Sequence, residues 1–388
     1  MIQKILFILG GFLTGLFLSY WLVFHPSLQF NFSGDNKKTI QIEIPQKQII
    51  GFLPYWLIDK AKADYSEYIT TLTYFGLTIN KDGTIMKKTN PQETEPGWND
   101  LQKGKLDSIF KTAKEKKLKL SLLVFSGNHD SINELISKPE EHAHNLTQEV
   151  IPIMQQYGFT DLNLDIESIK QASESARLNF TQFAQVIKQD LDKAQIGSLT
   201  IDITGSDLIK QNLINPQSIV SIADYVVLMG YDYHYMGSFV TGAVAPLAGA
   251  ETSLEYDVQT AVGKMEQIMP VSKIILGLPL YGYEWETINE NPNSAVIPSS
   301  GLTASNQRIE DFLSKCSSCS AQRNFLTQES SLIYKDQQTG TYHQMFYPDE
   351  ISTTAKVNFA KEQDLGGLAL WALGYEGRTI LEPLKDYK

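Results

Sequence analysis

Residues 160–170 read TDLNLDIESIK, and they alternate polar with aliphatic side chains. Four polar side chains occupy every second position of this segment: Asp161, Asn163, Asp165 and Glu167. A period of two is the signature of a β-strand, and it directs the polar and the aliphatic side chains to opposite faces. We therefore expect a strand over residues 161–167 with its aliphatic face in a hydrophobic core. The opposite face would carry three carboxyl groups and one amide side by side, which calls for a chemical explanation.

The rest of the chain alternates strand-like and helix-like segments. Runs typical of short buried strands occur at seven other places: residues 48–53, 71–78, 119–125, 199–204, 225–229, 273–278 and 368–371. Helical patterns, such as residues 101–116 and 172–193, separate most of them. Strands that alternate with helices in this way predict an α/β fold of the (β/α)8 TIM-barrel type over residues 48–388. A doubly wound open sheet is the alternative, but no glycine-rich nucleotide motif follows the first strand.

The segment between the seventh and eighth predicted strands is too long for a single crossover helix. We expect it to hold a small α+β insertion at about residues 283–365. The chain has two cysteines, Cys316 and Cys319, and both fall in this segment. Because no second pair exists, a four-cysteine zinc site is excluded. A local disulfide is the preferred interpretation, and two free thiols are the alternative.

The N-terminal residues 5–24 form an apolar run without a charge. About twenty apolar residues are enough to cross a bilayer as a helix. Lys4 precedes the run and Trp21 lies near its far end, where aromatic side chains favour the membrane interface. We interpret residues 1–26 as a signal anchor and transmembrane helix, residues 27–47 as a linker, and the remainder as an extracytoplasmic domain at the cell surface. A cleaved signal peptide, which would give a secreted protein, and a buried helix of a soluble protein are the alternatives.

The net charge argues against nucleic acid as a partner, and the positions of the histidines argue against a metal site. The formal net charge is -11, whereas binding to nucleic acid needs a basic surface. His142 and His144 form the one His-x-His pair, but they lie in a polar segment with a helical pattern. Residues two apart on a helix do not face each other, so we expect no metal site there, and no cofactor motif is present.

Aromatic side chains follow several of the predicted strands. In a parallel barrel the carboxyl ends of the strands meet at one mouth, where active sites form. Carboxyl groups surrounded by aromatic rings suit a sugar, because its apolar ring face stacks on aromatic side chains while its hydroxyl groups form hydrogen bonds. The candidate residues at these ends, besides Asp165 and Glu167, are Tyr55, Tyr231, Asp232, Tyr281, Trp285 and Trp371.

Four of these segments together resemble glycoside hydrolase family 18, the chitinase-like barrels. FTDLNLDIE, residues 159–167, resembles the family motif D-G-x-D-x-D-x-E on the fourth strand. LMGYDYH (228–234), KIILGLPLYGYEW (273–285) and LGGLALWALG (365–374) resemble its later motifs and follow in the same order. The resemblance covers roughly residues 48–385, and the motifs are closest to those of bacterial members of the spore-cortex-lytic type.

The resemblance implies a role for each candidate residue. Glu167 would protonate the leaving glycosidic oxygen, while the 2-acetamido oxygen of the substrate attacks the anomeric carbon and the configuration is retained. Asp165 would hold the acetamido N–H, and Tyr231 would donate a hydrogen bond to the acetamido oxygen. The remaining candidates would bind the substrate: Asn163, Asp232, Trp371, Tyr55, Tyr281 and Trp285. Asn163 would also donate a hydrogen bond to Asp165.

The same resemblance implies a substrate class and leaves a rival open. The substrate would be a β-1,4-linked glycan that contains N-acetylglucosamine, such as peptidoglycan, chitin or another envelope polysaccharide. Thr160, Asp161 and Asn163 depart from the family motif, and these departures weaken the case for chitin more than the case for hydrolysis. The rival is a membrane-tethered barrel that binds a glycan without cutting it. The retained acid, Glu167, favours hydrolysis.

Overall fold

The computed structural model describes residues 47–168, 170–250, 256–316 and 319–388. The apolar run at residues 5–24 and almost all of the expected linker lie outside these residues, so the structure does not bear on the predicted anchor. Within the described ranges, no helix is long and apolar enough to cross a membrane.

Eight parallel strands close into a barrel, which confirms the predicted fold. In chain order they are β1 (Gln48–Pro54), β2 (Thr71–Thr78), β5 (Lys119–Ser126), β6 (Asp161–Ile166), β7 (Ser198–Thr204), β8 (Tyr225–Met229), β9 (Ile274–Pro279) and β15 (Gly367–Trp371). Each strand pairs with the one before it in this series, and β15 closes the ring by pairing with both β9 and β1. All eight strands predicted from the sequence are present.

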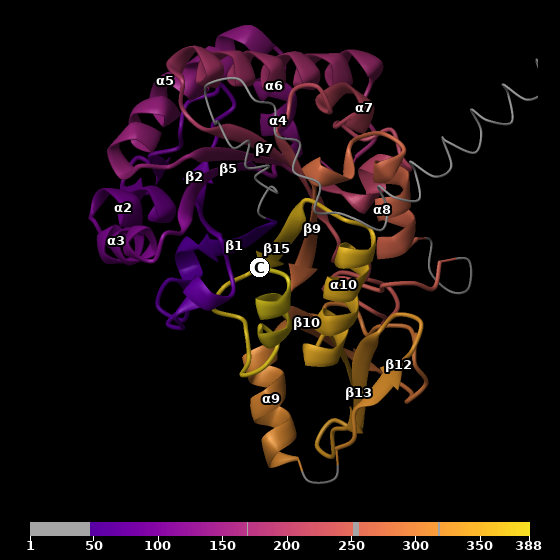
Figure 1. Ribbon diagram of the computed structural model, residues 1–388. Coiled ribbons are helices and arrows are strands. Elements are labelled where there is room, and N and C mark those ends of the chain that lie inside the picture. The colour runs from indigo at the N-terminus through magenta and orange to yellow at the C-terminus, as the bar shows by residue number, and fades with distance from the viewer. Residues whose placement is uncertain (1–46, 169, 251–255, 317–318) are drawn as a thin grey trace, which may run out of the picture. The chain divides into compact units, whose positions relative to one another are not determined.

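Helices surround the barrel on the outside (Figure 1). They are α2 (Pro96–Gln102), α3 (Asp107–Glu115), α4 (His129–Leu135), α5 (Pro139–Tyr157), α6 (Glu174–Ala194), α7 (Pro216–Ile219), α8 (Val258–Glu266) and α10 (Glu350–Glu362). Five 3-10 helices are η1 (Tyr55–Leu57), η2 (Tyr65–Glu67), η3 (Gly205–Leu208), η4 (Val271–Lys273) and η5 (Glu382–Asp386) among the described residues. A short hairpin of β3 (Lys88–Asn90) and β4 (Glu93–Thr94) lies between β2 and α2.

Local signals in the sequence fix where the long helices begin and end. The hydroxyl of Ser173 accepts a hydrogen bond from the N–H of Ala176 and so caps the start of α6. Helix α5 begins with Pro139 at its first position, where a missing N–H costs nothing. It ends at Tyr157 and is capped by Gly158, whose φ of 74° lies in the left-handed region that glycine adopts without strain.

Two separate hydrophobic cores explain the alternation in β6. The larger core fills the layer between strands and helices, and it includes Leu162 and Leu164 of β6 together with Phe180 and Phe183 of α6. The smaller core lies inside the barrel: Ile50, Phe52, Leu123, Val227, Ile275 and Ala369. Because the aliphatic face of β6 packs against the helices, its polar face points into the barrel interior.

The predicted insertion between the seventh and eighth barrel strands is a five-stranded antiparallel sheet with one helix. It consists of β10 (Tyr281–Thr287), β11 (Leu302–Ser305), α9 (Asn306–Lys315), β12 (Gln322–Asn324), β13 (Glu329–Lys335) and β14 (Tyr342–Tyr347). In Figure 1 it lies below the barrel. The expected end at residue 365 is too late, because Val357 and Ala360 of α10 belong to the larger core of the barrel.

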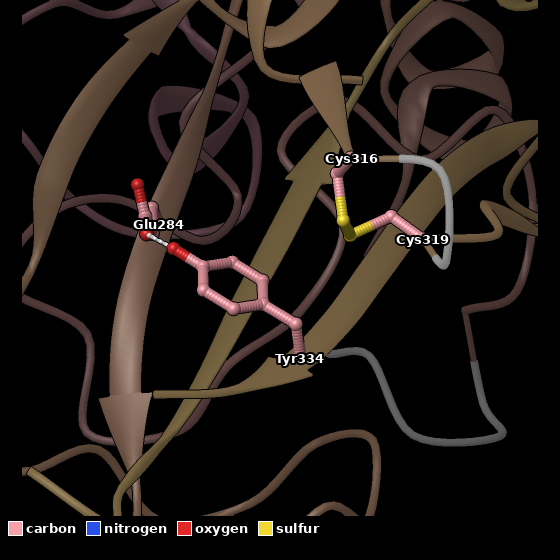
Figure 2. Close-up of a disulfide and its surroundings, with 4 residues drawn as sticks. All are labelled: Glu284, Cys316, Cys319 and Tyr334. Atoms are coloured by element: carbon pink, nitrogen blue, oxygen red, sulfur yellow. Dashed lines mark hydrogen bonds between the residues drawn. A yellow bond between two sulfur atoms is a disulfide. The ribbon is translucent and has the colours of Figure 1, made fainter. Parts of the chain in front are cut away.

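Cys316 and Cys319 form a disulfide at the end of α9, as the sequence predicted. Figure 2 shows it beside Tyr334 of β13, whose hydroxyl donates a 2.7 Å hydrogen bond to Glu284 of β10. Cys319 packs against the small hydrophobic core of the insertion, so the disulfide stabilises this part of the fold. Neither cysteine lines the cavity described below.

Candidate active site

The polar side chains of β6 do not share one role. Asp161, the first of them, accepts hydrogen bonds from three hydroxyl groups, those of Ser121 and Ser198 at 2.6 Å and that of Thr200 at 2.9 Å. Burial raises the pKa of the Asp161 carboxyl, and the three hydroxyl groups oppose that rise. With its acceptor sites satisfied by neighbouring strands, Asp161 joins β5, β6 and β7 and belongs to the framework of the barrel.

Asn163 has a different partner from the one predicted. Its side chain is fully buried, and its amide Nδ2 donates a 2.9 Å hydrogen bond to Oδ1 of Asp202 on β7. The expected hydrogen bond from Asn163 to Asp165 is therefore wrong. The prediction failed because it considered one strand alone, whereas the amide reaches across to the neighbouring strand. Asn163 does not line the cavity, so it does not contact a ligand there.

Asp165 lies deep in the barrel mouth and is 4% exposed. Its Oδ1 atom has no hydrogen-bond partner among the described residues. Burial raises the pKa of the Asp165 carboxyl well above its usual value, and the neighbouring carboxyl groups of Glu167 and Asp202 raise it further. An unpartnered acceptor at the bottom of a cavity can take an N–H donor from a ligand.

Glu167 follows the end of β6, where its backbone N–H donates to the carbonyl oxygen of Ser126 on β5. Glu167 is exposed where it opens onto the cavity, and protein atoms cover its carboxyl group on the other sides. This partial burial raises the pKa of the Glu167 carboxyl, and the negative charges of Asp232 and Asp207 add to the effect. A carboxyl group with a raised pKa retains its proton at higher pH, which a general acid requires.

Tyr231 and Asp232 follow β8 and face the same cavity. Asp232 has a φ of 60°, and its Oδ1 accepts hydrogen bonds from the hydroxyl groups of Tyr281 at 2.5 Å and Tyr283 at 2.9 Å. Gly277 on β9 makes room for Tyr231, because a Cβ at this position would lie 2.9 Å from Cε1 of the ring. Tyr281 is buried and does not line the cavity, so it acts on a ligand only by holding Asp232.

Aromatic rings form the other wall of the site. Trp371 at the end of β15 contacts the rings of Phe52, Phe75 and Trp56, with centroid distances of 5.9, 5.1 and 6.3 Å. The peptide bond between Trp371 and Ala372 is cis. Tyr55 packs edge-on against Trp56, and both line the cavity. These rings meet edge to face and together form an apolar wall of the cavity.

The carboxyl groups and aromatic rings enclose one cavity of about 800 Å³ at the carboxyl ends of the barrel strands. Its lining is Phe52, Tyr55, Trp56, Phe75, Thr78, Glu95, Leu123, Phe125, Asp165, Glu167, Asp202, Thr204, Gly205, Ser206, Lys210, Met229, Tyr231, Asp232, Tyr233, Tyr235, Tyr256 and Trp371. This volume lies in the range of small-molecule and sugar sites. No group of three metal-ligating side chains occurs among the residues that the structure describes.

The prediction for Trp285 is wrong. Its side chain is fully buried in the insertion, where it packs against Tyr283 and Phe346, and its indole N–H donates to the carbonyl oxygen of Tyr235. Through this hydrogen bond the ring holds the loop after β8, and it has no exposed face on which a ligand could stack. The prediction failed because β10 leaves the barrel directly after β9, so a residue close to a strand end in sequence lies outside the mouth.

Sequence reasoning also missed Asp202 and Tyr283. Asp202 is 4% exposed and lines the cavity beside Asp165. Its signal was available, because Thr200, Asp202 and Thr204 alternate with aliphatic residues along β7 as the polar side chains do along β6. Tyr283 had no such signal, since its contact with Asp232 depends on the path of β10.

Comparison with known proteins gives a family and several relatives. The model of the family "Glycosyl hydrolases family 18" matches residues 48–376. A curated relative, the cortical fragment-lytic enzyme of Bacillus cereus, is 24% identical over 313 residues. The match covers 79% of this chain and 65% of that enzyme, so this chain spans less than two thirds of the relative's length.

Two solved structures show the same fold. The spore cortex-lytic enzyme SleL of Bacillus cereus aligns with a TM-score of 0.69 and 19% identity, and the alignment covers 88% of this chain and 74% of that one. The Ostrinia furnacalis Group IV chitinase in complex with allosamidin aligns with a TM-score of 0.74 and 21% identity, over 88% of this chain and 97% of that one. With the family model matching most of the barrel, the chain belongs to glycosyl hydrolase family 18.

Proposed function

We propose that the protein is a retaining glycosidase that hydrolyses β-1,4-linked glycans containing N-acetylglucosamine with the help of the substrate's own acetamido group. One observation carries the proposal: Glu167, Asp165 and Tyr231 line a single cavity whose other wall includes Trp371. A proton donor, an acetamido partner and an aromatic platform are the parts that such a reaction needs.

Glu167 is the general acid. Because burial and the negative charges of Asp232 and Asp207 raise its pKa, its carboxyl group retains a proton that it can give to the leaving glycosidic oxygen. After the leaving sugar departs, the same carboxylate takes a proton from the water that attacks the intermediate. One residue thus acts as acid and then as base, as microscopic reversibility requires.

Asp165 and Tyr231 act on the acetamido group. In the substrate-assisted reaction the acetamido oxygen attacks the anomeric carbon and forms a positively charged oxazolinium ring. The unpartnered Oδ1 of Asp165 accepts a hydrogen bond from the acetamido N–H, and a negative charge on Asp165 stabilises the ring. The Tyr231 hydroxyl, whose pKa burial raises well above its usual value, stays protonated and donates to the acetamido oxygen.

The other cavity residues bind and orient the sugar. Trp371, at the end of β15, presents its half-buried ring to the cavity as a stacking surface. Asp232 is held by two tyrosine hydroxyl groups, so its carboxylate is fixed relative to Glu167 before a substrate arrives. Preorganised polar groups of this kind act on the transition state without a reorganisation cost.

We propose an envelope glycan such as peptidoglycan as the natural substrate, with chitin as the second candidate. The name of the Bacillus relative refers to lysis of cortical fragments, and this chain shares with that relative most of its barrel. Products formed from peptidoglycan and from chitin oligosaccharides under the same conditions distinguish the two candidates. Efficient cleavage of chitin oligosaccharides with none of peptidoglycan would overturn the order of preference.

The rival function is glycan binding without cleavage. A fluorogenic β-1,4-linked N-acetylglucosamine oligomer tests it, with binding and turnover measured on the same protein. We expect turnover by the unaltered chain and a loss of about 10² to 10⁴ in rate for Glu167→Gln, the range of a general acid, with binding largely retained. Glu115→Gln is the matched control, because Glu115 is exposed on the outer helix α3. Binding without turnover by the unaltered chain would favour the rival.

We also propose, from residues 5–24 alone, that the chain is anchored in a membrane with its barrel on the outer side. Fractionation of cells that express the full chain tests this location, and deletion of residues 1–30 should release an active soluble barrel. Recovery of the full-length product mainly in the soluble fraction, shortened at its N-terminus, would show a cleaved signal peptide instead.

A further inference from the structure

Two buried carboxyl groups stand next to each other at the base of the cavity. Asp165 on β6 and Asp202 on β7 are each 4% exposed, and both line the cavity. In the parallel pairing of these strands, Leu164 lies opposite Ile201, so the next step of the register brings Asp165 beside Asp202. Adjacent strands lie about 4.8 Å apart, and the two side chains extend from the same face of the sheet.

The described residues offer this pair no cationic partner. Neither carboxyl group forms an ion pair with any described residue. Asp202 accepts one hydrogen bond, from the amide of Asn163, whereas Oδ1 of Asp165 and Oδ1 of Asn163 have no partner among the described residues. Two like charges at this separation on buried side chains do not ionise together readily, so the pair titrates as a unit.

We propose that Asp165 and Asp202 share a single proton and that Asp202 is a positioning residue, which takes the proton from Asp165 when the substrate reacts. The inference rests on the proposed function of the cavity. Before reaction, the charge lies on Asp202, because the Asn163 amide donates to that carboxylate, and Asp165 is neutral. As the oxazolinium ring develops its positive charge beside Asp165, the O–H bond of Asp165 breaks and an O–H bond forms on Asp202. The number of protons does not change.

The groups around the pair favour this distribution. For Asp202, burial raises the pKa, the hydrogen bond from Asn163 lowers it, and the charges of Asp161 and Glu167 raise it. For Asp165, burial raises the pKa most, and the charges of Glu167 and Asp202 raise it further. Of the two carboxyl groups, therefore, only that of Asp202 accepts a hydrogen bond from a described residue, and this bond stabilises its ionised form.

The flanking strands add no opposing charge. Asp202 lies opposite Val227 of β8, and Asp165 lies opposite Phe125 of β5. Tyr231 faces both carboxyl groups, and its neutral hydroxyl can only donate a hydrogen bond or accept one. Among the described residues, the titratable side chains that interact with the pair are therefore Asp161, Glu167 and Tyr231, and Lys210 is a cation elsewhere in the cavity lining.

A kinetic test uses Asp202→Asn, which keeps the shape of the side chain and removes its charge. With a shared proton, this change forces the charge onto Asp165. Asp165 lies two residues from Glu167, and Glu167 is the first of the charges that act on it, whereas Asp202 lies on the neighbouring strand and Glu167 is the last of the charges that act on it. The pKa of Glu167 then rises, and the alkaline limb of kcat/KM moves to higher pH. If Asp202 and Asp165 were ionised independently, the change would remove a negative charge near Glu167, and the limb would move to lower pH. A purely structural role would leave it in place.

The exchange variant Asn163→Asp/Asp202→Asn supplies the control. This double variant exchanges the amide and the carboxyl group that are joined by the hydrogen bond between positions 163 and 202. It should return the alkaline limb of kcat/KM toward that of the unaltered chain. Glu284→Gln is the matched control for loss of a buried carboxyl group, since Glu284 is held by Arg308 and Tyr334 in the insertion and does not line the cavity. A limb that moves to lower pH in Asp202→Asn, or stays fixed, would overturn the proposal.

A spectroscopic test does not depend on activity. Infrared difference spectra over a pH range report the C=O stretch of neutral carboxyl groups, and Asp165→Asn and Asp202→Asn assign the signal of the pair. We expect each single variant to lower the titration midpoint of the remaining carboxyl group by about one unit or more, the scale of close carboxyl groups. Unshifted midpoints would refute the shared proton even in an active enzyme. Shifted midpoints in a protein without turnover would uphold the pair and refute the proposed function.

Discussion

Lys356→Met should destabilise the protein far more than removal of an exposed lysine. Lys356 on α10 lies 3.2 Å from the carboxylate of Glu329 on β13, and both side chains are 1% exposed. Glu329 also accepts hydrogen bonds from the backbone N–H groups of Val244 at 2.7 Å and Ala245 at 2.9 Å. The pair thus connects the insertion, a barrel helix and the segment that follows β8 and Asp232.

The magnitude follows from what remains after the change. Methionine fills much of the space of the lysine stem, so little packing is lost, but the Glu329 charge stays buried with two N–H donors and no cation. Breaking a buried pair by removal of one partner costs about 3–5 kcal/mol of the free energy of unfolding. In contrast, Lys47 and Asp364 form an exposed pair, with side chains 32% and 82% exposed, and Lys47→Met should cost about 1 kcal/mol or less.

Urea denaturation of the barrel, residues 46–388, measures both changes, because this range forms one compact unit. The double variant Lys356→Met/Glu329→Gln should recover part of the loss, since it removes the unpaired charge as well. A loss below about 1 kcal/mol for Lys356→Met would show that the pair behaves like one at the surface.

Three further changes test the site and the insertion. Asp232→Asn removes the charge that most raises the pKa of Glu167, so Glu167 should lose its proton at lower pH. The alkaline limb of the kcat/KM profile should then move to lower pH, and a limb that stays in place would contradict this. Trp371→Ala should raise KM for N-acetylglucosamine oligomers by roughly tenfold or more, the scale of one lost aromatic contact, and an unchanged KM would exclude the stacking role. Replacement of Cys316 and Cys319 by Ser should lower the free energy of unfolding by about 2 kcal/mol or less, given the short loop, and leave kcat unchanged; a large loss of kcat in a folded protein would show that the disulfide supports catalysis.

The sequence predicted the barrel because each strand carries its own signal. Buried parallel strands read as short apolar runs, and β6 shows the additional alternation that separates the helix-facing side from the interior. The carboxyl ends of these strands then placed Asp165, Glu167, Tyr231 and Trp371 at one mouth. All four line the same cavity.

The sequence did not predict contacts that depend on how strands are staggered or where they leave the barrel. Asn163 bonds to Asp202 on the next strand instead of to Asp165 on its own, and this choice is set by the offset between β6 and β7. Trp285 lies in the core of the insertion because β10 departs from the barrel at Tyr281. Neither fact has a signature in the local order of residues.

The anomeric configuration of the first product shows whether the acetamido oxygen or water attacks the anomeric carbon. Proton NMR during the first turnovers of a β-1,4-linked N-acetylglucosamine oligomer distinguishes the two anomers before mutarotation mixes them. Attack by the acetamido oxygen followed by water inverts the anomeric carbon twice, so we expect the β anomer as the first product. Initial formation of the α anomer would show direct attack by water and would contradict the roles assigned to Asp165, Tyr231 and Glu167.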